Sequence, residues 1–263
     1  LEMNEQTPPA LNLKLLGTGA ADYDWNRFGE EGVRGSTSSL LDGHILIDCG
    51  ITGLRNLERF GIPCAAIDTL LVTHSHDDHF LPEQIAVLAA GRPTPLAVYA
   101  SAEAVAELGG IPGIAAFPLH SGMKFRLGET AVTALPANHL TNIPGEQAFH
   151  FCFETPAGNL LYALDGAWML KQAVRLIEHL RFDWIVMDCT MADSGDFRIF
   201  EHTDLAMAVH MIETLRNLNI VTPRTRIILD HLARTLWPAT EEERRRKIAG
   251  TGFELAFDGM ELR

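Results

Sequence analysis

The sequence predicts an α/β fold built from two similar halves, and three observations support this prediction. Short runs rich in Leu and β-branched residues alternate along the chain with segments of helical periodicity. Ile45–Ile47 and Ile185–Met187 are each followed by Asp-Cys, a helical segment and a second apolar run that leads into a histidine. No linker or low-complexity stretch divides the 263 residues. We therefore expect a single domain over residues 1–263.

The first half of the chain is expected to begin with a strand, followed by a long irregular loop over Ala20–Ser38. Asp42-Gly43 between two apolar runs predicts a hairpin. Apolar residues spaced three apart predict a helix from Ile51, and Pro82 suits the first residue of another. The expected strands are Leu11–Leu16, Ser39–Leu41, His44–Ile47, Ile67–Thr73 and Leu96–Tyr99, and the expected helices are Ile51–Phe60, Pro82–Ala90 and Ala102–Leu108.

The second half is expected to contain two hairpins and two strand–helix units. Pro156 and Gly158 mark the turn of the clearer hairpin. Thr240 and Glu243 form the sequence pattern of a capping box at a short charged helix. The expected strands are Lys124–Arg126, Ala131–Ala137, Phe149–Glu154, Leu160–Leu164, Trp184–Met187 and Arg226–Leu229, the expected helices are Leu170–Leu180 and Leu205–Leu218, and the tail from Phe253 to Leu262 is expected to form a hairpin.

Composition limits the classes of partner. Asp and Glu outnumber Lys and Arg by 34 to 21, which gives a formal net charge of −13 and argues against a long nucleic acid as ligand. No apolar run reaches the roughly 18 residues that span a membrane. Residues 1–4 show no signal-peptide pattern, so we expect a cytoplasmic protein. The four cysteines are far apart and are expected to be reduced thiols, and a homodimer stays open.

The stretch His74-Ser75-His76-Asp77-Asp78-His79 is the strongest chemical signal in the chain. Alternate side chains of an extended segment point the same way, so His74, His76 and Asp78 should converge, and a turn would bring His79 to them. Imidazoles and a carboxylate gathered after a buried strand suit zinc or manganese. The alternative, a solvated polar loop, does not account for this pattern, and we interpret the stretch as a metal site.

Three further residues come immediately after predicted strands: His139, Asp165 and His231. One such histidine alone would more often be structural. Three of them downstream of the histidine-rich stretch indicate additional ligands.

With these residues in this order, and with Gly17-Thr18-Gly19 and Asp48 ahead of them, nearly the whole chain resembles the metallo-β-lactamase superfamily of binuclear hydrolases. The resemblance implies a four-layer αββα sandwich with two mixed β-sheets between outer helices. It also implies two divalent metal ions, zinc or manganese. One metal would be held by His74, His76 and His139, and the other by Asp78, His79 and His231, with Asp165 bridging them and Asp48 orienting a ligand imidazole.

Within the superfamily, the chain is most similar to the PhnP-like cyclic phosphodiesterases and then to ribonuclease Z. The resemblance depends on Leu135–His139, Val186–Cys189, His202–Leu205 and the ending around Phe253–Glu261. The loop Ala20–Ser38 differs, because it has none of the cysteines that hold a structural zinc in the PhnP-like enzymes. Tyr23, Trp25 and Phe28 in this loop would either stack on a substrate or pack within the protein.

His202 lies at the start of the Leu205–Leu218 helix, with Thr203 as the expected N-cap. Helix N-termini favour phosphate, and by resemblance His202 binds a phosphate oxygen or protonates the leaving alkoxide. We therefore expect His202 and Asp78 to be the catalytic residues of a phosphodiesterase. In this hypothesis a metal-activated water attacks a small, cyclic phosphodiester in line. The alternatives are a lactone or thioester hydrolase on the same scaffold, and a non-catalytic metal-bound sensor or binding protein.

Overall fold

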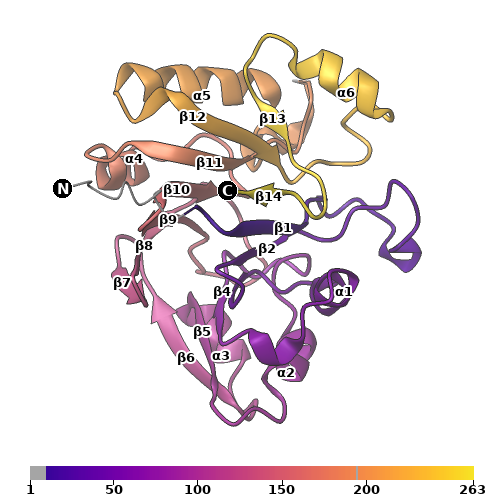
Figure 1. Ribbon diagram of the computed structural model, residues 1–263, viewed down its shortest axis with the longest axis vertical. Coiled ribbons are helices and arrows are strands. Elements are labelled where there is room, and N and C mark those ends of the chain that lie inside the picture. The colour runs from indigo at the N-terminus through magenta and orange to yellow at the C-terminus, as the bar shows by residue number, and fades with distance from the viewer. Residues whose placement is uncertain (1–9, 194) are drawn as a thin grey trace, which may run out of the picture.

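Two mixed β-sheets lie face to face in the computed structural model, which describes residues 10–193 and 195–263. Within these residues each sheet has seven strands. Figure 1 shows helices α1–α3 on the outer side of one sheet and α4–α6 on the outer side of the other. This is the four-layer αββα sandwich that the sequence predicted. Residues 1–4, on which the expectation of no signal peptide depends, lie outside the described part.

The first sheet combines the N-terminal half of the chain with the last strand. Its strand β3 pairs with β2 in an antiparallel hairpin and with β4 in parallel, so the sheet is mixed. In spatial order its strands are β14 (Glu261–Leu262), β1 (Leu13–Gly17), β2 (Ser38–Leu41), β3 (Ile45–Ile47), β4 (Thr69–Leu71), β5 (Leu96–Ser101) and β6 (Ile114–Leu119), and its helices are α1 (Gly53–Arg59), α2 (Pro82–Ala89) and α3 (Ala102–Glu107).

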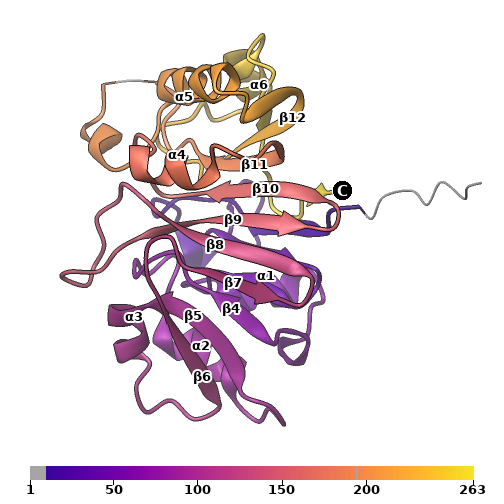
Figure 2. The same ribbon diagram turned by 90° about the vertical axis from the view of Figure 1, so that its left-hand side faces the viewer.

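The second sheet contains the remaining strands, and Figure 2 shows them stacked beside one another from β7 up to β11. The pairs β10–β11 and β11–β12 are parallel, and β7 to β10 form an antiparallel series. In spatial order its strands are β13 (Glu254–Leu255), β12 (Val221–Asp230), β11 (Phe182–Asp188), β10 (Gly158–Ala163), β9 (Phe149–Thr155), β8 (Thr130–Pro136) and β7 (Lys124–Leu127), and its helices are α4 (Lys171–Ile177), α5 (Leu205–Asn217) and α6 (Glu241–Ile248).

Alternation along the strands creates separate apolar layers. In β10, Tyr162 packs between the two sheets, whereas Leu161 packs on the outer side with α4 and α5. In β4, Leu71 faces the other sheet and Leu70 faces the layer of α1–α3. Because successive strand residues point to opposite faces, a sheet covered on both sides must be apolar at nearly every position. The continuous apolar runs in the sequence have this cause.

Two expectations about the strands were incomplete or wrong. Strand β6 was not predicted, because it is an edge strand that contains Pro118 and has several exposed side chains. The tail is not a hairpin: β13 pairs with β12 in the second sheet, and β14 pairs with β1 in the first. Asp258 fixes this crossing, because its carboxylate accepts hydrogen bonds from Thr18 N and Gly35 N at 3.0 and 2.7 Å.

The repeated strand–Asp–helix–strand–His pattern corresponds to two real structural units. The units β3–α1–β4 and β11–α5–β12 each have parallel strands, and each delivers an aspartate and a histidine to the same region. All four cysteines are unpaired, as expected. Among the described residues, no helix combines the length and apolar character needed to cross a membrane.

Candidate metal centre

The histidine-rich stretch leaves β4 and turns at its centre. The amides of His79 and Phe80 both donate to the carbonyl of His76, at 2.8 Å each, and this turn brings His79 back toward His74. The turn packs on Gly50, where an added Cβ would lie 2.1 Å from the backbone of Asp78. The local sequence therefore places the side chains, and a glycine leaves room for the turn.

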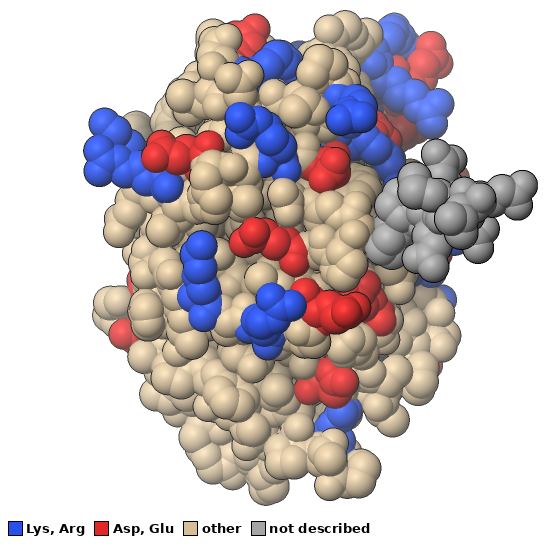
Figure 3. Space-filling view, turned by 60° about the vertical axis from the view of Figure 1, so that its left-hand side comes forward, with Lys and Arg blue, Asp and Glu red and all other residues tan. Residues whose placement is uncertain are grey.

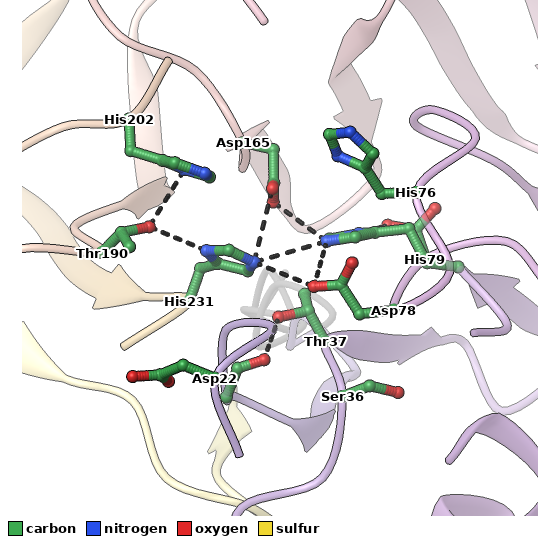
Figure 4. Close-up of polar contacts among 12 residues, drawn as sticks. Asp22, Ser36, Thr37, His76, Asp78, His79, Asp165, Thr190, His202 and His231 are labelled. Atoms are coloured by element: carbon green, nitrogen blue, oxygen red, sulfur yellow. Dashed lines mark hydrogen bonds and ion pairs between the residues drawn. The ribbon is translucent and has the colours of Figure 1, made fainter. Parts of the chain in front are cut away.

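The structure brings all seven predicted ligands together as two sets, and Asp165 of the first set also contacts His79 and His231 of the second. The ligand atoms within each set lie within 4.8 Å of one another. Figure 4 shows Asp165, Asp78, His79 and His231 converging on one point. The first set contains His74, His76, His139 and Asp165, and the second contains Asp78, His79 and His231.

Asp165 lies between the two sets. Its Oδ2 is 3.8 Å from His74 Nε2 and 3.6 Å from His139 Nε2 in the first set, and 3.3 Å from His231 Nε2 in the second. Its Oδ1 is 3.1 Å from His79 Nε2, but the direction of this contact is not that of a hydrogen bond. A buried carboxylate in this position suits a bridging ligand.

Hydrogen bonds on the outer side of the cluster fix the imidazole tautomers. His79 Nδ1 donates to Asp48 at 2.8 Å, and His139 Nδ1 donates to the carbonyl of Glu201 at 2.9 Å. Thr73 Oγ1 donates to Asp48 and so accepts from His74 Nδ1. In each ring Nε2 is then the atom with a free lone pair, and it points inward.

His231 follows the same rule from the other half of the fold. Thr190 Oγ1 donates to Asp188 at 2.9 Å and accepts from His231 Nδ1 at 2.8 Å. Inward lone pairs are what a metal requires, and outward N–H groups held by carboxylates, hydroxyls or carbonyls are typical of metal-ligating histidines. The chemistry of this donor set fits two divalent ions such as zinc or manganese.

In the metal-free cluster the histidine pKa values are raised in the second ligand set, whereas burial lowers those of His74 and His139 in the first. Burial lowers the pKa of His79, but Asp165, Asp78 and Asp48 outweigh burial and hold it well above its ordinary value. For His231 the same balance, led by Asp165, raises the pKa to about 9. His139 differs, since burial dominates and lowers its pKa to about 4. Without metal, the positive charge of the second set is carried by protonated histidines.

Three of the site residues that follow strands have left-handed backbone conformations. The φ angles are 62° at Asp48, 50° at Asp165 and 58° at His231. Such conformations are uncommon outside glycine and concentrate at functional sites. They turn the chain sharply at the end of a strand, so that the side chain faces the centre.

His202 lies beside the second set, but its helix differs from the prediction. The N-cap of α5 is Asp204, whose carboxylate accepts from Met207 N at 2.7 Å, and not Thr203. Thr203 instead uses its hydroxyl to donate to the carbonyl of Gly166. Because the Asp204 carboxylate occupies one amide of this helix N-terminus and opposes its positive dipole, the terminus suits a phosphate less than the sequence predicted.

Asp188 positions the His202 ring. It accepts from His202 Nδ1 at 2.7 Å, and the ring stacks on that of His231 with centroids 5.2 Å apart. Burial lowers the pKa of His202, but Asp188 and then Asp165 outweigh it, and the pKa is raised. Sequence analysis gave Asp188 no role, although its position repeats that of Asp48. His202 also forms a third potential ligand set, with Asp165 and His231.

A cavity of about 430 Å3 opens beside the cluster. Asp78 and His202 both line it, as does Asp22, whose oxygens are occupied by Arg234 N and Thr235. Asn142 and Arg198 also line it and were not anticipated, because they lie in irregular segments without a recognisable motif.

The aromatic residues of the loop 20–38 pack within the protein and are not among the residues that line the cavity. Tyr23 is buried, Trp25 donates to the carbonyl of Arg34, and Phe28 lies against Arg55. Figure 3 shows one face of the molecule, where Lys and Arg side chains are dispersed among acidic and uncharged ones and form no continuous basic area.

A four-layer αββα sandwich with two ligand sets joined by one carboxylate defines the class of metallo-β-lactamase-fold proteins with a candidate binuclear centre. The chain belongs to the β-lactamase superfamily: the profile of the Beta-lactamase superfamily domain matches residues 44–231.

Curated relatives match a short part of the chain. The anti-Pycsar protein Apyc1 of Paenibacillus xerothermodurans is 35% identical over 71 residues, which is 27% of this chain and 26% of that protein. Ribonuclease Z of Mycobacterium avium (strain 104) is 39% identical over 70 residues, 26% of this chain and 23% of that protein. The matches thus span about a quarter of the length of these relatives.

Solved structures match nearly the whole chain. A diphosphatase from the PhnP family has a TM-score of 0.74 at 20% identity and covers 97% of both chains. The short form of human tRNase Z (ELAC1) has a TM-score of 0.66 at 18% identity, over 96% of this chain and 98% of that one. At this level of identity the likeness establishes the fold.

Proposed function

We propose that the protein is a metal-dependent phosphodiesterase that hydrolyses a small phosphodiester. The observation that carries the proposal is His202, an imidazole with a raised pKa that is buttressed by Asp188 and lines the cavity beside both ligand sets. A phosphodiester carries a negative charge on its non-bridging oxygens, which a protonated imidazole can neutralise, whereas a lactone or thioester is neutral. The matched segment of ribonuclease Z supports the same class of reaction.

In this proposal each ligand set binds one divalent ion. His74, His76 and His139 would hold one ion, Asp78, His79 and His231 the other, and Asp165 both. Ions bound there would lower the pKa of a water and neutralise charge on the non-bridging phosphate oxygens.

The protein's own residues orient and protonate the substrate. Asp188 accepts from Nδ1 of His202, which leaves Nε2 for the cavity. A protonated Nε2 can donate to a phosphate oxygen and then to the leaving oxygen. Asp78 contributes as a carboxylate that lines the cavity and lies 3.4 Å from both His79 Nε2 and His231 Nε2.

The test compares His202→Ala with wild type on a 2′,3′-cyclic nucleotide, a lactone and a thioester, with metal content measured for each protein. We expect phosphodiester turnover to fall by about 100-fold or more, with the metal content unchanged. The control is His120→Ala, at an exposed histidine outside the cavity.

Unchanged phosphodiester turnover in His202→Ala would refute the proposed role. Loss of one metal ion from this variant would instead make His202 a ligand. Wild-type protein that hydrolyses a lactone or thioester but no phosphodiester would overturn the choice of substrate.

A further inference from the structure

The negative charge of the cavity walls would be nearly balanced by two bound divalent ions. Four aspartates line it: Asp22, Asp77, Asp78 and Asp165. Two divalent ions would be matched by these four carboxylates, so metal binding alone gives the cavity little net attraction for an anion. Among the residues that line the cavity, Arg198 is the one lysine or arginine. The permanent positive charge on the cavity wall is therefore that of Arg198, whose guanidinium also forms an ion pair with Asp196, a residue outside the lining.

A short turn over residues 196–201 positions Arg198. Asp196 begins the turn and accepts from the Arg198 backbone N at 2.9 Å, from its Nε at 2.8 Å and from its Nη2 at 3.2 Å. Among the residues that the structure describes, no hydrogen bond involves Nη1 of Arg198, so this group is available to a ligand. The ring centroid of Phe197, an exposed residue, lies 5.6 Å from Cζ of the guanidinium.

The other end of the turn is joined to the metal centre. The carbonyl of Arg198 accepts from the amides of Glu201 and His202 at 2.9 and 2.7 Å. The carbonyl of Glu201 accepts from Nδ1 of the predicted ligand His139. The position of Arg198 is therefore set by the same backbone that orients a ligand and the proposed acid.

We infer that Arg198 is a specificity-determining residue, which binds the negatively charged phosphate of the substrate and makes the site select anionic esters over neutral ones. This inference rests on the proposed phosphodiesterase function and specifies its substrate class further. A guanidinium is always charged, and its planar donors match phosphate oxygens, so it attracts and orients an anion where the metal charge is already balanced. A neutral lactone or carboxylic ester gains nothing from it.

The experiment measures Arg198→Ala and Arg198→Lys in the metal-loaded protein. Substrates are bis(p-nitrophenyl) phosphate, which is anionic, and p-nitrophenyl acetate, which is neutral. Binding of inorganic phosphate is measured in parallel by calorimetry. The matched control is Arg216→Ala, which removes the same charge from an exposed position near the end of α5.

We expect Arg198→Ala to raise KM for the phosphodiester by about 10- to 100-fold, the loss that follows from one or two charge-assisted hydrogen bonds. Phosphate binding should weaken by a similar factor, kcat should change by less than about threefold, and the neutral ester should be unaffected. Arg198→Lys should lie between wild type and Arg198→Ala, because it keeps the charge and loses the planar donors.

Unchanged KM and unchanged phosphate binding in both variants would overturn the inference. Equal losses on the neutral and the anionic ester would overturn it as well, because they would show a general defect of the site. Calorimetry separates this proposal from the previous one. If wild-type protein cleaved no phosphodiester, the proposed function would fail, yet weaker phosphate binding in Arg198→Ala would still support the anion-binding role.

Discussion

Replacing Asp48 by asparagine is expected to weaken metal binding by moving a single proton. Asp48 has a φ of 62°, which asparagine tolerates well, so the substitution changes the hydrogen bonding and little else. The Asp48 carboxylate accepts from His79 Nδ1 at 2.8 Å, from Thr73 N at 2.7 Å and from Thr73 Oγ1 at 2.8 Å. An asparagine amide in its place accepts through only one atom.

The amide must therefore present N–H to at least one of these donors. If its oxygen stays on Thr73 N, the NH2 group faces His79 Nδ1. His79 can escape this conflict by carrying its proton on Nε2, the atom that lies 3.1 Å from Asp165 Oδ1 at the centre of the site. Nε2 then has no lone pair for a metal.

The expected loss is about 10- to 100-fold in affinity for the metal of the second set, or about 1.4–2.7 kcal/mol. The stability of the metal-free protein should change less. The loss of one charge-assisted hydrogen bond costs about 1.5–3 kcal/mol, but removing a carboxylate whose pKa is raised by complete burial offsets part of it.

The assay is competition of the protein with a chelator for Zn2+, together with metal content after dialysis. Asp68→Asn is the matched control, because Asp68 forms the same contact with His44 at 2.8 Å on the exposed surface. Metal affinity and content equal to wild type in Asp48→Asn would show that the tautomer of His79 does not control the site.

Two further predictions concern the same centre. Gly50→Ala should abolish metal binding, because the added Cβ would lie 2.1 Å from the Asp78 backbone. The control is Gly61→Ala, in open space with φ +66°, which should lower the free energy of unfolding by only about 1 kcal/mol. Equal effects of the two substitutions in urea unfolding and metal titration would contradict this. The raised pKa of His231, about 9 against 6.5 in the unfolded chain, stabilises metal-free protein fully below about pH 6.5, and this contribution is lost as the pH rises through about 9. Chelator-treated protein should therefore become easier to unfold in urea over that interval while Zn2+ affinity rises, and a trend of opposite sign in either would refute the assignment.

Local sequence information was sufficient for most of the fold. The strands that are buried on both faces are recognisable in the sequence as continuous apolar runs. The capping box of Thr240 and Glu243 forms as predicted. Pairing between distant segments was not visible, since the tail contains nothing that distinguishes a hairpin from strands in two different sheets. Strand β6 was missed because its exposed side chains and Pro118 remove the usual pattern.

The site was predictable where ligands are contiguous or follow strands. The placement of His139, Asp165 and His231 near the histidine-rich stretch agrees with the prediction, although their binding of metal stays a prediction. The hydroxyls that fix the tautomers, Thr73 and Thr190, could not be found, because a threonine beside a histidine carries no signal until both are placed in space. Arg198 could not be found either, because it lies in an irregular segment and its position beside the cavity appears only in the folded structure.

The crossing of the tail between the sheets has a consequence for how the chain is made. Strand β1 cannot pair with β14, and Thr18 cannot bond Asp258, until those segments are synthesised; Asp258 comes 240 positions after Thr18. Until residues 261–262 have been synthesised, β1 therefore keeps an open edge that other strands can join. Contacts of such long separation form late, and a partly made chain of this kind is prone to aggregation. The candidate centre also contains His231, so its seven ligands are complete only after the unit β11–α5–β12 has been synthesised.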